Sequence, residues 1–135
     1  MCFSNDGKYI FSSVDIYIFQ WCIADYSNVQ SFCGHDYYRS VKCITISSDD
    51  KYLYSGSSDK SIIQWNVDDA SINQRCTYDS EILSIALSPD DQTLVAGSED
   101  CKVLVWAVSD DSFKMSRILS GHSNEVRGVA VSPDG

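Results

Sequence analysis

The stretch KYLYSGSSDKSIIQWN, residues 51–66, contains the pattern from which the fold can be predicted. It contains two short runs rich in Tyr, Leu and Ile, at 52–57 and 61–66, separated by a turn that includes Asp59. Aromatic and β-branched residues bounded by Ser, Asp and Gly are typical of short strands joined by turns. Asp59 lies six residues before Trp65. The stretch therefore predicts a pair of strands with the tryptophan on the second one.

The same neighbourhood occurs three times along the chain. Tryptophan stands at positions 21, 65 and 106, and an aspartate precedes each one by six residues, as Asp15, Asp59 and Asp100. Versions of one Ser- and Asp-containing turn recur at steps of 43, 41 and 44 residues, at 3–8, 47–51, 88–92 and 132–135. Gly-His occurs at 34–35 and again at 121–122. Self-similarity at a fixed period is the signature of a repeat architecture.

Each period contains four strand-like runs. In the middle repeat we expect them at 41–47, 52–57, 61–66 and 72–76. The runs VKCITI and ILSIAL are apolar on both faces, which is typical of a strand packed between neighbouring sheets. No part of the chain has a sustained helical period, so the sequence predicts an all-β fold.

A period of 41 to 44 residues with four strands, Gly-His near its start and Trp near its end resembles the WD-repeat family of the G-beta type. Blades of that family are four-stranded antiparallel sheets around a central channel. The resemblance covers nearly the whole chain and implies an incomplete ring of about three β-propeller blades. The expected divisions are a partial first blade at 1–33, a second blade at 34–76, a third blade at 77–120 and the first strand of a fourth blade at 121–135.

The resemblance also gives a structural role to residues that look like a catalytic triad. His35, Ser55 and Asp59 are the residue types of a nucleophilic triad. In WD-repeat blades the corresponding residues form a buried hydrogen-bonded chain with the tryptophan, which is Trp65 here. A carboxylate in a tight turn can accept N–H groups, and a buried indole N–H needs a partner. We therefore expect structure rather than catalysis here, and we expect the other repeats to contribute Asp15, Trp21, Asp100, Trp106 and His122.

The repeats depart from the family pattern in places. The residue after each tryptophan, aspartate in the family's name motif, is Cys22, Asn66 and Ala107. In the third repeat Tyr78 replaces the histidine, and Ala96 stands where the second repeat has Ser55. These departures put the hydrogen bonds of the third blade in question, but not its fold.

The charge of the chain bears on its partners. A formal net charge of −9, from 19 acidic and 10 scattered basic residues, disfavours binding to nucleic acid and membrane surfaces. The acidic pairs at 49–50, 68–69, 90–91 and 110–111 are typical of solvated turns. If they act together, they favour a basic partner and salt-sensitive binding.

Few residues are suited to chemistry. The six cysteines have no metal-ligand spacing, both histidines stand in Gly-His positions, and no glycine-rich phosphate loop is present. We predict no catalytic residue, no metal and no cofactor. Cysteines without a disulfide pattern and the lack of a membrane-spanning apolar run favour a cytoplasmic or nuclear location.

One loop carries candidate partner contacts. The segment from Gly34 to Ser47 is two residues longer than the one from Gly121 to Ser132, and the surplus falls at 36–39. Tyr and Arg are enriched in interface hot spots. Either Tyr37, Tyr38 and Arg39 contact a partner, or the rings pack back over the blade edge. The corresponding loops offer the secondary candidates Asp79, Ser80, Glu81, Asn124, Glu125 and Arg127.

The sequence thus predicts a non-catalytic scaffold for protein–protein interactions. The alternatives are the propeller portion of an enzyme, or a structural subunit of a large assembly, whose active residues lie outside this chain. We expect the chain to be a fragment of a larger propeller. The alternative is self-assembly, in which two copies close one ring.

Overall fold

The structure is a computed structural model that describes residues 1–109 and 112–135. Within these residues it contains β-strands and no helix. The expected acidic pair at 110–111 lies outside the described residues. The strands are β1 (Cys2–Phe3), β2 (Tyr9–Val14), β3 (Tyr17–Cys22), β4 (Asn28–Cys33), β5 (Val41–Ile46), β6 (Tyr52–Ser57), β7 (Ser61–Asn66), β8 (Ile72–Thr77), β9 (Ile82–Leu87), β10 (Thr93–Ser98), β11 (Lys102–Ser109) and β12 (Ser112–Ser120).

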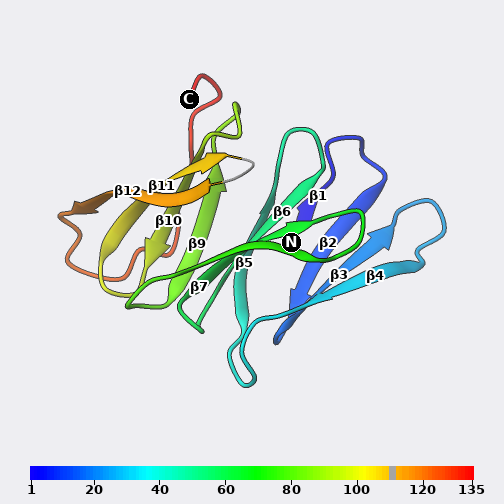
Figure 1. The fold of residues 1–135 in the computed structure, drawn as a ribbon, viewed down its shortest axis with the longest axis horizontal. Helices are drawn as coiled ribbons and strands as arrows, with labels where there is room; N and C mark the ends of the chain where they lie inside the picture. The colour runs from blue at the N-terminus through cyan, green and yellow to red at the C-terminus, as the bar shows by residue number, and fades with distance from the viewer. Residues whose placement is uncertain (110–111) are drawn as a thin grey trace.

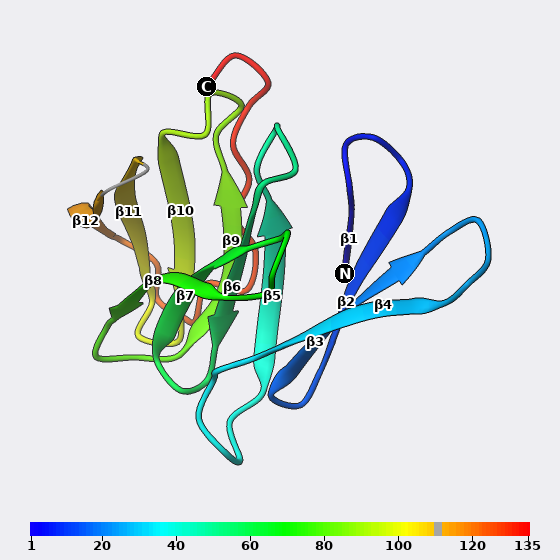
Figure 2. The same ribbon diagram turned by 45° about the vertical axis from the view of Figure 1, so that its right-hand side comes forward.

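The strands form three antiparallel sheets of four strands each. Their orders are β1-β2-β3-β4, β5-β6-β7-β8 and β9-β10-β11-β12, so every strand pairs with its neighbour in sequence. The sheets stand side by side in chain order, from the blue first sheet to the yellow and orange third sheet (Figure 1). Turning the molecule separates the first sheet from the other two (Figure 2). The all-β architecture of propeller blades expected from the sequence is confirmed.

The hydrophobic core lies between neighbouring sheets. Successive residues of β7 point to opposite faces of the pleat, so Ile63 packs toward the first sheet and Ile62 toward the third. Phe32 of the first sheet meets Trp65 of the second edge-to-face, with ring centroids 5.8 Å apart. Strands β6 and β7 of the middle sheet are therefore buried on both faces, whereas its last strand β8 is partly exposed. The two cores comprise Phe11, Ile18, Phe32, Val41, Ile44, Leu53, Ile63 and Trp65 on one side, and Tyr54, Ile62, Ile82, Leu94, Ala96, Leu104, Trp106, Val108 and Phe113 on the other.

Two of the acidic pairs, at 49–50 and 90–91, lie in turns that join the first two strands of a sheet, whereas the pair at 68–69 lies between β7 and β8. In the middle sheet Asp49 closes its own turn, because its Oδ1 accepts from Ser47 Oγ at 2.7 Å and from the Lys51 N–H at 3.1 Å. Asp50 instead reaches the turn of the first sheet, where it accepts the Asn5 N–H at 2.7 Å.

Asp91 repeats this contact one sheet later. It accepts from the Ser48 N–H at 3.0 Å and from Ser48 Oγ at 2.6 Å. The second acid of the pairs at 49–50 and 90–91 therefore ties one turn to the preceding one, which the expectation of a merely solvated turn did not include. In the pair at 68–69 the second acid instead closes its own turn, since Asp69 Oδ1 accepts the Ser71 N–H at 2.9 Å.

The expected first strand of a fourth blade is not formed. Residues 121–135 contain no strand in the structure. Val126 is nevertheless buried, and its N–H donates to the Ser98 carbonyl at 3.0 Å. This segment lies along the third sheet, but no second strand pairs with it among the described residues. A β-strand is stabilised by the ladder of hydrogen bonds to a neighbour, so the apolar pattern at 126–131 is not sufficient to form one here.

Candidate functional site

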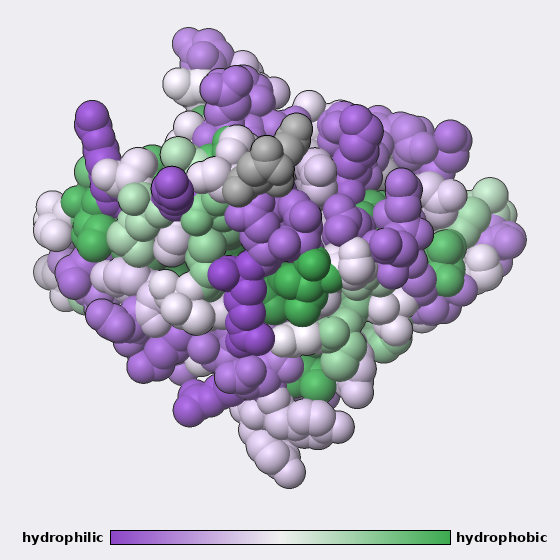
Figure 3. Space-filling model, in the orientation of Figure 1, coloured by the Kyte–Doolittle hydropathy of each residue, from purple (hydrophilic) through white to green (hydrophobic). Residues whose placement is uncertain are grey.

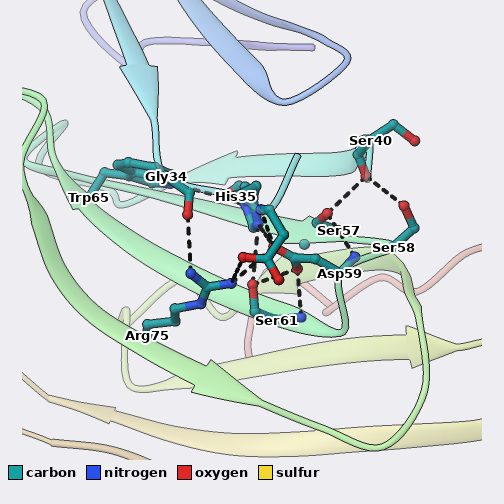
Figure 4. Close-up of polar contacts among 12 residues, drawn as sticks. Gly34, His35, Ser40, Ser57, Ser58, Asp59, Ser61, Trp65 and Arg75 are labelled. Carbon is teal, nitrogen blue, oxygen red and sulfur yellow. Dashed lines mark hydrogen bonds and ion pairs between the residues drawn. The ribbon is translucent and has the colours of Figure 1, made fainter. Parts of the chain in front are cut away.

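The second sheet holds a buried polar network. His35 lies at the start of the loop between β4 and β5, Ser55 is on β6 and Trp65 is on β7. His35 Nε2 is 2.7 Å from Ser55 Oγ, and the Trp65 indole N–H donates to the same oxygen at 2.8 Å. His35 Nδ1 lies 2.8 Å from Asp59 Oδ2 (Figure 4). The structure thus brings these four predicted residues into one chain of hydrogen bonds.

Gly34 explains why glycine precedes this histidine. A Cβ atom at Gly34 would lie 2.9 Å from the Trp65 ring and 2.7 Å from the side chain of Ile72. The backbone can pass the indole only without a side chain, because real Cβ contacts are essentially never this close. The Gly-His pair therefore seats the histidine directly beside the tryptophan.

Asp59 is the most connected residue of the network. Its Oδ2 also accepts from the Asp36 N–H at 3.0 Å and from Arg75 Nη2 at 3.1 Å, and its Oδ1 accepts from Ser61 Oγ at 2.6 Å (Figure 4). Burial by itself raises the pKa of this carboxyl. The hydrogen bonds from His35, Ser61 and the Asp36 backbone outweigh burial and hold the pKa well below its ordinary value.

The triad-like residues Ser55, His35 and Asp59 are not accessible from the surface of the molecule. Ser55 has 0% of its surface exposed, and the side chains of His35 and Asp59 are also 0% exposed. A nucleophile must approach the reacting atom to within about 3–3.5 Å. The Ser55 hydroxyl, which accepts the Trp65 N–H, cannot be approached in this way in the closed blade.

The third sheet holds an altered version of the network. Tyr78 stands in the histidine position, and its hydroxyl donates directly to Asp100 Oδ2 at 2.9 Å. Lys102 Nζ lies 2.9 Å from the same carboxylate oxygen. Ala96 has no hydroxyl, and the buried Nε1 of Trp106 has no hydrogen-bond partner, alone among the buried side-chain N and O atoms of the described residues. The sequence raised a question about this blade, but it did not indicate the Tyr78–Asp100 bond.

The remaining predicted network residues are more exposed. Trp21 is 37% exposed, and its indole N–H donates to Ser12 Oγ at 3.0 Å, a serine–tryptophan pair without a histidine. The Asp15 carboxylate makes no hydrogen bond or ion pair with the described part of the chain. His122 is exposed and makes no contact with any other member of the predicted set. The structure does not join these residues into a buried network.

The predicted contact loop projects from the molecule. Tyr37 is 75% exposed and Tyr38 is 97% exposed, with their rings 5.9 Å apart. The loop that follows β4 forms the protrusion at the lower edge of the molecule (Figures 1 and 3). The rings therefore do not pack back over the blade edge. Arg39 lies 3.5 Å from Glu81 of the third sheet's loop.

A groove of about 700 Å³ opens beside this loop. It lies between the first and second sheets on the side of the turns that follow β2 and β6. It is lined by Asp15, Ile16, Tyr17, Tyr37, Tyr38, Arg39, Ser40, Lys42, Ser58 and Glu81.

The described residues hold no cluster of three or more metal-ligating side chains. Burial raises the pKa of the Cys43 thiol to about 12 and that of Cys2 to about 11. Both thiols are protonated at neutral pH, and a protonated thiol is a poor nucleophile and metal ligand. No helix long and apolar enough to cross a membrane occurs in the described part of the chain.

Comparison with known proteins gives a consistent result. The family described as WD domain, G-beta repeat matches residues 26–66, 72–107 and 113–135. Protein ROOT INITIATION DEFECTIVE 3 of Arabidopsis thaliana is 40% identical over 67 residues, which is 47% of this chain and 14% of that protein.

Two solved structures superpose with a TM-score of 0.84 each. They are described as the crystal structure of RRP9 WD40 repeats, 27% identical, and the structure of U3-55K, 28% identical. Each match covers 96% of this chain, which spans 39% and 40% of the two solved chains.

Proposed function

Because the chain belongs to the WD domain, G-beta repeat family, we propose that it is a non-catalytic scaffold that binds other proteins through the loop at 36–39. WD40 repeats generally mediate protein–protein interactions. The observation that carries the proposal is the exposed pair of rings, Tyr37 and Tyr38, held beside a groove. Large aromatic side chains are the residues that most often anchor interfaces.

The backbone supports this assignment of the loop. Tyr38 has a φ of 66°, in the left-handed region that bulky residues rarely adopt. Seven other described non-glycine residues, Tyr26 among them, share this region, so the conformation defines the shape of the loop and does not by itself mark a site. The buried network anchors the loop from behind, because the Asp36 N–H donates to Asp59. A partner would therefore meet rings on a backbone that is already fixed.

The proposal also covers partner class and location. A net charge of −9 favours proteins over nucleic acid or membrane surfaces. The six cysteines are free thiols, which persist in reducing compartments, so we assign the protein to the cytoplasm or nucleus.

The proposal is tested by affinity capture with a loop variant. The variant combines Tyr37→Ser, Tyr38→Asn and Arg39→Ala, with asparagine at position 38 because it tolerates a positive φ. The matched control is Tyr26→Asn, since Tyr26 is 83% exposed with a φ of 59° but does not line the groove.

We expect the loop variant to lose, by tenfold or more, proteins that the parent chain and the control retain, while its melting temperature stays unchanged. Equal recovery by all three proteins would contradict the proposal.

A further inference from the structure

The groove beside the contact loop is walled by tyrosines from two sheets. Tyr17 begins β3 of the first sheet and is 37% exposed, and Tyr37 and Tyr38 belong to the loop before β5. The two sides are joined by the backbone, because the Val41 N–H donates to the Asp15 carbonyl at 2.7 Å. The walls of the groove are therefore set by the packing of two neighbouring sheets.

The charges in the groove fall into a satisfied pair and two free groups. Arg39 and Glu81 lie within ion-pair distance of each other at 3.5 Å. The Asp15 carboxylate and the Lys42 ammonium line the groove without any hydrogen bond or ion pair to the described residues. A ligand can thus gain an ionic contact from Asp15 or from Lys42 without breaking an existing one.

The surroundings favour a cation as the ligand group. The faces of tyrosine rings attract cations and not anions. A second groove of about 380 Å³ shares Lys42 and Glu81 and adds the carboxylate of Glu99, which has no ion-pair partner in the described part of the chain. The net charge of −9 also steers basic partners toward the protein. The positive charge of Lys42 repels a cationic ligand. Replacing Lys42 with a neutral residue should therefore strengthen the binding of a cation and weaken the binding of an anion.

We propose, on the basis of the proposed function, that this groove binds an arginine or lysine side chain from an extended segment of the partner protein. The cation lies against the Tyr17, Tyr37 and Tyr38 rings and pairs with the Asp15 carboxylate. The segment continues past Lys42 toward Glu99. The contact loop then provides apolar area, and Asp15 provides selectivity for charge.

The test uses two tripeptides that differ only in the central side chain, Ac-Gly-Arg-Gly-amide and Ac-Gly-Glu-Gly-amide. Each is titrated into the isotope-labelled chain, and binding is followed by NMR chemical shifts. We expect the arginine peptide to bind in the millimolar range and to shift the signals of Tyr17 and Tyr38. We expect the glutamate peptide to bind more weakly.

Three substitutions separate this inference from non-specific attraction. Asp15→Asn keeps the left-handed backbone at φ 50° and should weaken arginine-peptide binding about two- to fivefold, as expected for one exposed ion pair. Lys42→Gln should strengthen it by a similar factor, and Tyr26→Asn should leave it unchanged.

Stronger binding of the glutamate peptide, or weaker arginine-peptide binding in Lys42→Gln, would overturn the inference. If the loop variant loses protein partners but the arginine peptide fails to bind, the inference fails and the proposed function stands. If no partner depends on the loop, the proposed function itself fails.

Discussion

Ala96→Ser should stabilise the third sheet, because it supplies the hydroxyl that the Trp106 indole lacks. Trp106 is 4% exposed and its N–H has no partner. An unsatisfied buried donor costs about 1–3 kcal/mol, and a new bond recovers only part of this because the added hydroxyl must also be buried. Ser12 and Trp21 show that the pair forms without a histidine, at 3.0 Å. We expect a gain of about 1 kcal/mol in the free energy of unfolding.

The reciprocal change gives the comparison. Ser55→Ala leaves Trp65 Nε1 and His35 Nε2 without their shared partner, so two buried groups lose a bond. We expect a loss of roughly 2–4 kcal/mol. Urea unfolding followed by circular dichroism measures both changes, and about 1 kcal/mol corresponds to a shift of roughly 3–5 °C in melting temperature. Ala107→Ser, at an exposed position of the same sheet, is the control and should change neither value.

A lower free energy of unfolding in Ala96→Ser, with Ala107→Ser neutral, would contradict the expected bond to the Trp106 indole. That result would mean that the site has no room for the oxygen, and that the third blade tolerates the unpaired indole for reasons of packing. An unchanged free energy of unfolding in Ser55→Ala would show that the stability of the second blade does not depend on its polar network.

Three further predictions concern turns, acid stability and the triad-like residues. Asp91→Asn should lower the free energy of unfolding by about 1 kcal/mol, because it weakens the hydrogen bonds to the Ser48 turn. Asp68→Asn, at an exposed site, is the control and should leave that free energy unchanged, as measured by urea unfolding. The folded-state pKa of Asp59 is lowered, so its contribution to stability is complete above the unfolded pKa of about 4 and is lost as the pH falls further. Unfolding curves from pH 7 to about pH 2.5 should show a steeper acid loss in the parent than in Asp59→Asn, and parallel pH profiles would count against this assignment. A fluorophosphonate probe should leave Ser55 unmodified in the folded chain by mass spectrometry, and its labelling would revive the catalytic alternative.

The fold could be predicted from the sequence because each repeat carries the same pattern of strands and turns. The two runs in the opening stretch correspond to β6 and β7. Each tryptophan also marks the third strand of its sheet. The family predicted from that repeat is confirmed.

The features that the sequence does not predict are pairings and hydrogen bonds between residues that lie far apart along the chain. The run at 126–131 has the apolar pattern of a strand, yet pairing requires a second strand that spacing alone does not reveal. Likewise the 2.9 Å bond between Tyr78 and Asp100 joins residues 22 positions apart, and it forms because the tyrosine hydroxyl extends as far as the carboxylate. The direction of the Tyr37 and Tyr38 rings was also open, since an inserted loop can fold inward or project.

The acidic pairs illustrate the same limit. Composition places them in turns, and the structure agrees for the pairs that it describes. The hydrogen bond between Asp50 and Asn5 joins residues 45 positions apart, and it forms only because the two sheets pack side by side. In the pairs at 49–50 and 90–91 the local pattern therefore predicts the first acid, which closes its own turn, better than the second.

His35, Ser55 and Asp59 act together to stabilise the blade that carries the contact loop. A double-mutant cycle of Ser55→Ala and Asp59→Asn, measured by urea unfolding, tests it most directly, because both residues bond the same imidazole. We expect a coupling free energy of about 1 kcal/mol or more between them. Effects that add to within about 0.3 kcal/mol would show that the two residues act independently and would contradict the claim.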